Sequence, residues 1–249
     1  MSQTVLPTRV KHFLSPANKA YIKPVCTVDV NDAFVFFANP EPSSQKEIVL
    51  IKPPVLFSKN SYSTPVTMPI GLAYLAAVLS KANYRVSIID CPGLAMNNIQ
   101  LTSDGKFKVQ GISVKESIKR ISQNVDIIGI SIMFSQEWPS VRNYFNQIRE
   151  SFPNARIIVG GEHPSALPEY TLRDCPAIDY MVLGEGELAL LELVYRLRKN
   201  IPINTVNGVA YIEGGEFFQT GLAPRIASIK EIPWPKWDLI DMNVYFQPN

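Results

Sequence analysis

Short apolar runs recur along the chain from residue 47 onward. Each run is continuously rich in Val, Ile and Leu and does not alternate with polar residues, so both faces of each predicted strand are covered. Strands of this kind are typical of a parallel sheet between two layers of helices. The runs with their flanking residues are "EIVLIKPP" (47–54), "RVSIIDC" (85–91), "DIIGISIM" (126–133), "ARIIVGG" (155–161) and "DYMVLGEG" (179–186).

Segments with a helical spacing of apolar residues separate these runs. In the first of them, Pro69 suits the opening turn of a helix, and a Ser-x-x-Glu capping box formed by Ser113 and Glu116 begins the second. The alternation of strands and helices predicts a doubly wound, five-stranded parallel α/β domain with a Rossmann-like fold. Helices are predicted over 69–83, from 114, over 141–152, around 167–175 and over 187–200.

The chain divides into three segments by this pattern. Residues 1–46 are rich in proline and small polar residues, which predicts loops and at most one strand, in the apolar island "AFVFFANP". Residues 47–204 hold the α/β domain, with a small hairpin predicted at 99–110. Residues 205–249 hold a second hairpin and a connector rich in proline and aromatic residues, which we expect to pack as a strap on a neighbouring surface.

Composition and charge exclude several function classes. The 249 residues are 46% hydrophobic and 18% charged, and a formal net charge of +2 is too small to predict binding to nucleic acid or to an anionic membrane. No apolar run approaches the ~20 residues of a membrane span, and the N-terminus lacks the apolar core of a signal peptide. We therefore expect a cytoplasmic protein with reduced thiols and without nucleic-acid or membrane partners.

The predicted carboxyl ends of the strands, where ligands of such sheets bind, lack several familiar catalytic motifs. The loop at 52–69 contains no glycine, which excludes a dinucleotide-binding turn and a P-loop, and no G-x-S-x-G nucleophile elbow occurs. The few histidines and the widely spaced cysteines fit neither a zinc site nor a disulfide framework, so we predict no catalytic residue and no metal site. These residues are His12, His163, Cys26, Cys91 and Cys175.

Small residues remain at three neighbouring strand ends, as Ser131, Gly160-Gly161, and Gly184 with Gly186. Any one of these glycines is explained by a tight turn alone. Together they predict a wall of bare backbone on which a flat or extended ligand lies between the sheet and the helices. Its hydrogen bonds would come from backbone N–H groups and from Ser131.

From Glu47 onward the chain resembles the cobalamin-binding domain that precedes the radical S-adenosylmethionine core in cobalamin-dependent radical enzymes. Cobalamin-binding domains more widely share an Asp-x-His-x-x-Gly, Ser-x-Leu, Gly-Gly series. Ser131-x-Met133 and Gly160-Gly161 match the last two elements, and the first, with its ligand histidine, is missing from "KPPVLFSKN". The matching segments are "KPP", "MPIGLAYLAAVLSKANYRVSIID", "DIIGISIMFS", "IIVGGEHPSALPEYTL", "DYMVLGEGE" and "IPWPKWDLIDMNVY".

The resemblance implies cobalamin as the cofactor and assigns roles to the residues at the strand ends. It implies that Gly160-Gly161 leave room for the dimethylbenzimidazole tail and that Ser131 lines or hydrogen-bonds this tail. Met133 and Phe134 are expected to face the lower side of the corrin. The remaining residues expected at the cofactor are Pro54, Ser135, Glu162, His163, Gly184, Glu185 and Gly186.

Some of these positions keep two interpretations. His163 lies past the tail-binding glycines, so we expect it to make a structural hydrogen bond, with cobalt ligation as the alternative. Trp138 either stacks on the cofactor or packs at a helix start. Glu185 and Glu187 are expected to be helix-start carboxylates stabilised by the helix dipole. The cofactor is therefore expected to bind base-off and without a histidine ligand.

The resemblance further implies radical chemistry, most often methyl transfer. That chemistry needs a four-iron four-sulfur cluster on a C-x-x-x-C-x-x-C loop, which the three isolated cysteines cannot supply. The cluster and S-adenosylmethionine are expected on a radical core, either in cis or on a separate partner. Two other classes stay open, namely a doubly wound enzyme that uses a nucleotide or sugar nucleotide, and a cofactor-free interaction module that docks through its aromatic tail.

Overall fold

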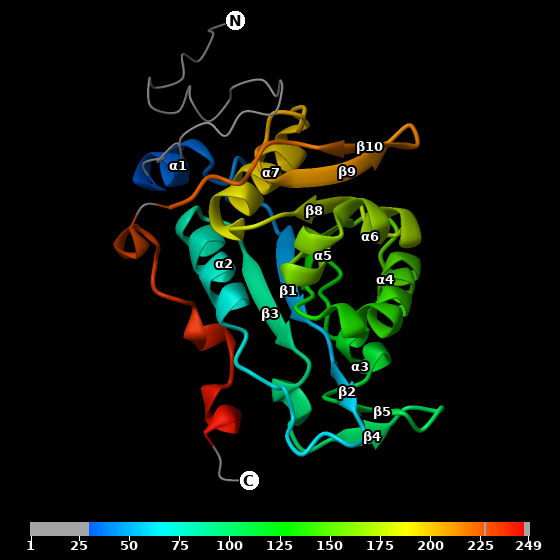
Figure 1. Cartoon of the computed structure of the whole chain (residues 1–249). Helices are drawn as coiled ribbons and strands as arrows, with labels where there is room; N and C mark the ends of the chain where they lie inside the picture. The colour runs from blue at the N-terminus through cyan, green and yellow to red at the C-terminus, as the bar shows by residue number, and fades with distance from the viewer. Residues whose placement is uncertain (1–29, 227, 247–249) are drawn as a thin grey trace, which may run out of the picture.

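The computed structural model describes residues 30–226 and 228–246, and its central feature is a seven-stranded sheet (Figure 1). The strand order is β10-β9-β8-β7-β6-β1-β3, in which the strands from β8 to β3 are parallel. This arrangement confirms the predicted doubly wound fold with five parallel strands. The strands are β1 (Glu47–Lys52), β3 (Val86–Asp90), β6 (Val125–Ser131), β7 (Arg156–Gly160), β8 (Tyr180–Val182), β9 (Val209–Glu213) and β10 (Glu216–Gln219).

Helices cover both faces of the sheet, and successive residues of a strand point to opposite faces. In β1, Ile48 and Leu50 belong to the core cluster with α1, α2 and α7, whereas Val49 and Ile51 belong to the cluster with α3, α4 and α6. Two apolar layers require apolar residues at consecutive positions, which explains the continuous Val/Ile runs. The helices are α1 (Val30–Phe36), α2 (Ile70–Lys81), α3 (Val114–Lys119), α4 (Trp138–Ser151), α5 (Glu162–Ala166), α6 (Pro168–Asp174) and α7 (Gly186–Lys199).

Helix α1 occupies Val30–Phe36, where the sequence pattern predicts at most a strand, so that prediction is wrong. Its buried residues recur every three or four positions, which is a helical spacing. The intervening apolar Val35 and Phe36 hide this spacing, because they make the segment look like one continuous run. None of the buried apolar residues is more than 5% exposed, and all belong to the core cluster with α2 and α7: Val30, Ala33, Phe34 and Phe37.

The sheet is larger than predicted, because the hairpin expected as an appendage after residue 205 joins its edge. Strand β9 pairs antiparallel with β8 through Met181–Ala210 and Val182–Val209, and β10 follows as the outermost strand. The hairpin thereby covers the polar backbone groups that β8 would otherwise leave unpaired.

A small second sheet contains the other predicted hairpin. Its strands are β2 (Val55–Ser58), β5 (Phe107–Gln110) and β4 (Ile99–Leu101), in that order. The predicted turn is present at Gly105, whose φ is +65°. Strand β2 is not predicted by the pattern, since it follows two prolines and is too short to show a period of its own.

The aromatic connector forms a strap, defined here as residues 228–246, which runs along α2 toward the end of β3 (Figure 1). The Lys236 N–H donates to the Ala73 carbonyl at 3.0 Å, and the Tyr245 hydroxyl donates to the Asp90 carboxylate. The strap contains short 3-10 turns and no regular strand. Within the described residues the 3-10 turns are η2 (Gly93–Ala95), η3 (Ser135–Glu137), η4 (Ile229–Glu231), η5 (Trp237–Leu239) and η6 (Met242–Tyr245).

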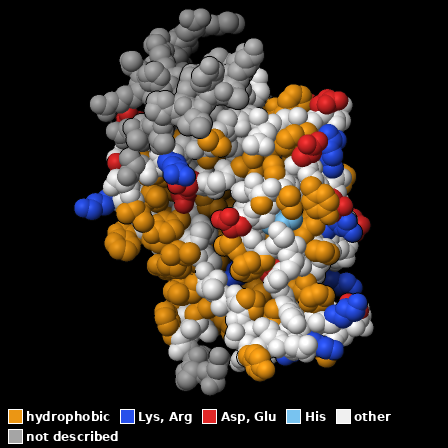
Figure 2. Space-filling view, in the orientation of Figure 1, with side chains coloured by type: hydrophobic (Ala, Val, Ile, Leu, Met, Phe, Trp, Pro, Cys, Tyr) orange, Lys and Arg blue, Asp and Glu red, His pale blue; other side chains and the backbone are white. Residues whose placement is uncertain are grey.

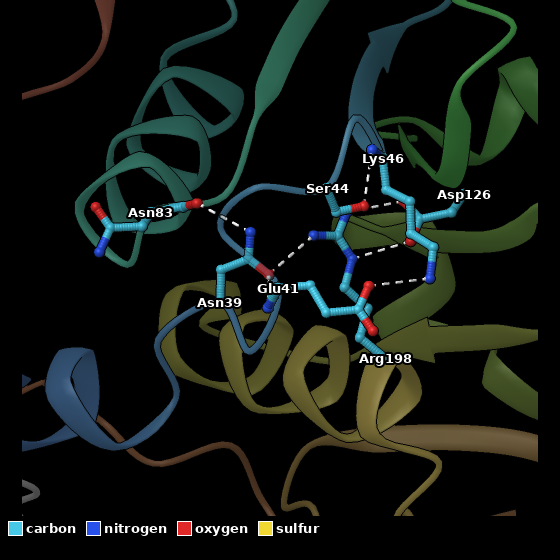
Figure 3. Close-up of polar contacts among 7 residues, drawn as sticks. All are labelled: Asn39, Glu41, Ser44, Lys46, Asn83, Asp126 and Arg198. Atoms are coloured by element: carbon cyan, nitrogen blue, oxygen red, sulfur yellow. Dashed lines mark hydrogen bonds and ion pairs between the residues drawn. The ribbon is translucent and has the colours of Figure 1, made fainter.

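An ion pair with a buried guanidinium joins α7 to the amino-terminal end of the sheet (Figure 3). Arg198 donates two hydrogen bonds to the Asp126 carboxylate, at 2.9 and 2.8 Å, and a third to Asn39 at 3.4 Å. Asn39 in turn donates to the Asn83 carbonyl at 3.1 Å. The network connects the chain before β1, the end of α2, the start of β6 and the end of α7.

A second ion pair, within α7, makes the stability of the fold depend on pH. Glu192 is fully buried, and one oxygen, Oε1, accepts from Arg196 Nε at 2.8 Å, whereas Oε2 has no partner. Burial raises the pKa of Glu192 from 4.5 to about 7, and the facing Arg196 guanidinium offsets only part of this rise. The folded state therefore binds this proton more tightly than the unfolded state does.

We expect the free energy of unfolding to fall between pH 4.5 and pH 7, by up to ~3 kcal/mol, because the carboxyl ionises in the unfolded chain first. Glu192→Gln should remove this part of the pH dependence. Urea unfolding at a series of pH values measures it, with the exposed Glu150→Gln as control. An unchanged pH profile in Glu192→Gln would contradict the assignment.

Candidate functional site

The carboxyl ends of the parallel strands, called the carboxyl edge below, bring most predicted site residues together. The strand register pairs Ser131 with Gly160, and Gly160 with Val182. On the other side, Lys52 at the end of β1 pairs with Asp90 at the end of β3. Since β1 lies between β3 and β6, the chain reverses its direction of winding there, which is where ligands of open α/β sheets bind.

The two glycines that end β7 have different structural roles. A Cβ built on Gly160 would meet the Val182 carbonyl oxygen at 3.5 Å, which is an ordinary contact. Gly161 has a φ of +114°, and a Cβ there would lie 2.2 Å from the Ile132 carbonyl oxygen. Gly161 is thus required by the backbone itself, whereas Gly160 leaves a bare strand end where the backbone would accept a Cβ.

Exposed apolar side chains lie beside this bare backbone. Met133 and Phe134 follow β6 and are 51% and 45% exposed, and Ser131 before them is half-buried. Pro54, half-buried, follows β1, and Glu162, exposed, opens α5. Figure 2 shows hydrophobic and uncharged side chains over much of this face, with an acidic group near the middle of the view. Bare backbone, apolar side chains and a hydroxyl group suit a large, mostly neutral ring system such as cobalamin.

His163 is held by hydrogen bonds at both ring nitrogens. Nδ1 lies 2.9 Å from Ser135 Oγ, and Nε2 lies 3.2 Å from Thr171 Oγ1. Thr171 donates its own proton to the Leu167 carbonyl at 2.7 Å, so it accepts from Nε2–H, and Nδ1 accepts from Ser135. Burial lowers the pKa of His163, which favours the neutral form of the ring. The ring is 2% exposed.

Trp138 packs within the protein and not on the surface of the crevice. Its ring stacks on His163 with centroids 5.0 Å apart, and its indole N–H donates to Asp174 at 2.8 Å. Because Trp138 is 3% exposed, the packing interpretation from the sequence describes the structure.

The turn between β8 and α7 contacts three neighbouring segments: α5, α2 and the chain after β10. The Gly184 N–H donates to Ser165 at 3.2 Å, and a Cβ on Gly186 would approach Leu75 to 3.2 Å, so Gly186 permits close packing of α7 on α2. Glu185 precedes the first turn of α7, as predicted, but its carboxylate accepts from the Ile226 N–H at 3.2 Å and does not cap the helix. Glu187 lies in the first turn, and burial raises its pKa.

Three charged side chains at the carboxyl edge were not among the predicted site residues. The Lys52 ammonium donates to the Thr67 carbonyl, near the end of the loop that connects β1 to α2. This loop, residues 53–69, is called the first loop below. The Glu137 carboxylate accepts hydrogen bonds from backbone groups of Phe134 and Leu56. Lys52 and Glu137 therefore hold the first loop near both of its ends.

Asp90 completes this charged group, and burial dominates the pKa of all three side chains. Burial lowers the pKa of Lys52, which Asp90 and Glu137 oppose. Burial raises the pKa of Asp90, against the Tyr245 hydrogen bond and the Lys52 charge, and Asp90 Oδ1 has no partner. Burial likewise raises the pKa of Glu137. The sequence signal that could have identified Lys52 and Asp90 is a charged residue at the end of an apolar strand, as in "IVLIK" and "VSIID".

No group of three or more His, Cys, Asp and Glu side chains in the described ranges is arranged to hold a metal ion. Cys91 and Cys175 are buried free thiols, and burial raises the pKa of both, that of Cys91 to about 12. Such thiols are not poised to act as thiolate ligands. Cys26 lies outside the described residues. No helix in the described part of the chain is long and apolar enough to cross a membrane.

The chain belongs to the B12-binding domain family, because the family model described as "B12 binding domain" matches residues 62–194, just over half of the chain. This match covers Ser131 and Gly160-Gly161. It confirms the resemblance seen in the sequence and cobalamin as the cofactor.

Curated relatives carry the same domain within longer proteins. An uncharacterised methyltransferase of Pyrococcus horikoshii is 34% identical over 201 residues, which are 80% of this chain and 40% of that protein. Cytidylyl-2-hydroxyethylphosphonate methyltransferase of Streptomyces wedmorensis is 28% identical over 231 residues, which are 84% of this chain and 43% of that protein. The chain thus spans less than half the length of these relatives.

Solved structures with the same fold include two cobalamin-dependent radical enzymes. OxsB with aqua-cobalamin and S-adenosylmethionine bound is matched with a TM-score of 0.57 and 23% identity, over 78% of this chain and 24% of that one. TsrM of Kitasatospora setae, a radical S-adenosylmethionine methyltransferase, is matched with a TM-score of 0.52 and 17% identity, over 70% and 30%.

Proposed function

We propose that this chain binds cobalamin at the carboxyl edge with the dimethylbenzimidazole base displaced from cobalt and with no histidine in its place. The observation that supports this most is the bare strand end at Gly160, next to the Ser131 hydroxyl. A base inserted between these residues cannot also ligate the cobalt of the same molecule. Met133 and Phe134 would then contact the lower side of the corrin.

The geometry of His163 supports the absence of a histidine ligand. Both of its nitrogens already have hydrogen-bond partners, and its ring stacks on the buried Trp138. Ligating cobalt would break one of these bonds and expose a ring that is 2% exposed. The first loop contains no histidine either.

We further propose that the domain serves a cobalamin-dependent radical S-adenosylmethionine enzyme, and most simply a methyltransferase. Two relatives with this domain are named methyltransferases, and this chain covers less than half of each. The radical core would lie in cis or on a partner. Bound cobalamin would supply a methyl-carrying cobalt centre, and the residues of this chain would hold the corrin and keep its lower side apolar.

Hydroxocobalamin separates the proposed function from its two alternatives. Protein incubated with it and desalted should keep the visible absorption of cobalamin. A nucleotide-using enzyme or a cofactor-free interaction module would lose the absorption during desalting, and either result would overturn the proposal.

Electron paramagnetic resonance of the bound cob(II)alamin tests the axial ligation. We expect no nitrogen superhyperfine splitting in the wild-type protein, because neither the base nor a histidine reaches cobalt. Splitting that disappears in His163→Ala would show that His163 is the ligand. Splitting that survives this substitution would show that the base stays on cobalt and that Gly160 does not receive it.

Glu137→Gln should weaken cobalamin retention about tenfold without unfolding the domain. An amide offers one acceptor oxygen where the carboxylate serves the backbone of both Phe134 and Leu56, so the first loop loses one attachment. Equilibrium titration with hydroxocobalamin measures the change. Gln136→Ala, which alters the exposed neighbour in the same turn, is the control. Equal affinities in all three proteins would show that this attachment does not matter for the cofactor.

A further inference from the structure

A cavity of about 470 Å³ lies beside the first loop, among the small sheet, the loop after β2 and the last turn of the strap. Figure 1 shows the last turn of the strap on one side of the first loop and the small sheet on the other side. The volume falls within the range of sites for small molecules. None of the residues expected at the cofactor lines it. The lining of the cavity is therefore distinct from the set of residues expected at the cofactor.

The lining of the cavity is polar and carries one positive charge without a negative one. Lys108 of β5 lines it half-buried, and within the described residues this lysine forms no ion pair, whereas Asp and Glu are absent from the lining. Ser61, Ser63 and Thr64 add hydroxyl groups along one wall. A cation among hydroxyl groups in a concave site favours an anionic ligand.

A buried amide in the same lining lacks a hydrogen-bond donor. Gln110 is 2% exposed, and its Nε2 donates to the Met96 carbonyl at 2.5 Å, while Oε1 has no partner. A buried acceptor without a donor costs about 1–3 kcal/mol. A ligand with a hydroxyl or N–H group would satisfy this oxygen.

The remaining wall is apolar and ordered by the strap. Phe57 of β2 and Val244 of the strap line the cavity, and Tyr245 next to Val244 is held by its hydrogen bond to Asp90. Since Phe57 is 5% exposed, this wall is a packed surface and not a loose side chain. It suits a ligand with a small apolar part.

From these features we infer that the cavity is a binding site for a small organic anion that carries a hydrogen-bond donor and an apolar part. Lys108 binds the anionic group, Gln110 Oε1 accepts from the donor, and Phe57 with Val244 contacts the apolar part. The first loop itself lines the site, from Phe57 to Val66. Its occupation does not depend on cobalamin.

The test uses (4-hydroxyphenyl)phosphonate, which combines the three features, with isotope-labelled full-length protein. Titration followed by amide chemical shifts should move the signals of residues 108 and 110. Calorimetry should show that Lys108→Gln weakens binding at least ~10-fold, about 1.4 kcal/mol. Lys106→Gln, which removes an exposed charge from the adjacent turn, should bind as the wild type does.

The hydroxyl group provides a second, independent comparison. The wild type should bind (4-hydroxyphenyl)phosphonate more tightly than phenylphosphonate, and Gln110→Leu should bind the two equally. Equal losses in Lys108→Gln and Lys106→Gln, or no shift in either residue at millimolar probe, would overturn the assignment. The titration is repeated with and without hydroxocobalamin, so that the anion site and the proposed cobalamin function are tested separately. A protein that binds the anion but retains no cobalamin would contradict only the proposed cobalamin function.

Discussion

Gly160→Val should abolish retention of cobalamin and leave the domain folded. Its Cβ would make only an ordinary contact with the Val182 carbonyl, and a β-branched residue suits a strand end. The two methyl groups would fill the space proposed for the dimethylbenzimidazole tail. We expect an affinity at least ~100-fold lower, about 2.7 kcal/mol, in a hydroxocobalamin titration, with an unchanged circular dichroism spectrum.

Gly161→Ala should instead destabilise the fold, because its φ of +114° is strained for alanine and its Cβ would overlap the Ile132 carbonyl. We expect a loss of at least ~2 kcal/mol in urea unfolding. Gly71→Ala in α2, where a Cβ would meet nothing within 4 Å, is the control and should be neutral or stabilising.

The pair of variants separates a ligand role from a turn role. Unchanged cobalamin affinity in Gly160→Val would place the tail elsewhere. A Gly160→Val protein that unfolds as readily as Gly161→Ala would show that both glycines serve the backbone alone.

Arg198→Ala should lower the free energy of unfolding by about 3 kcal/mol, because it leaves Asp126 without the guanidinium that binds both its oxygens. The Arg198 side chain is 2% exposed, so solvent does not screen the pair on that side. The network lies at the amino-terminal end of the sheet, opposite the carboxyl edge where we propose that the cofactor binds (Figure 3). Urea unfolding measures the change, and cobalamin affinity below the unfolding transition should stay within about twofold of wild type.

Arg173→Ala is the matched control for this loss. Its partner Glu169 lies one helical turn away, at 2.9 Å, and both side chains are about half exposed. Such surface pairs contribute about 0–1 kcal/mol. Similar losses in Arg198→Ala and Arg173→Ala would contradict the importance given to the buried network.

The parallel sheet is readable in the sequence for a physical reason. A strand covered on both faces must be apolar at every position, so each of the five runs from "EIVLIK" to "DYMVL" marks itself without reference to the others. The α1 helix and strand β2 are not readable in this way. In α1 the surplus apolar residues mask the helical spacing, and β2 is defined only by pairing with β5, which lies 55 residues further along the chain at the pair Val55–Gln110.

The candidate site also combines features that the sequence predicts with features that only the structure shows. Gly160-Gly161 and Ser131 were readable because glycine at the end of an apolar strand is conspicuous, and their adjacency follows from parallel pairing. The different roles of the two glycines required backbone angles and the position of the Ile132 carbonyl. Glu137 stands in a predicted loop, yet its link to Leu56 appears only when that loop and the first loop meet.

The sequence by itself determined the fold class, the family and the strand ends proposed for the cofactor, because all three depend on residue types that recur locally along the chain. Only the tertiary structure decided that His163 is occupied by Ser135 and Thr171, and that Tyr245 reaches Asp90 across 155 positions of the chain. It also placed Lys108 and Gln110 in one cavity with the strap. Hydrogen bonds and cavity walls join residues far apart in the chain, and no local pattern of residue types records which of them will meet.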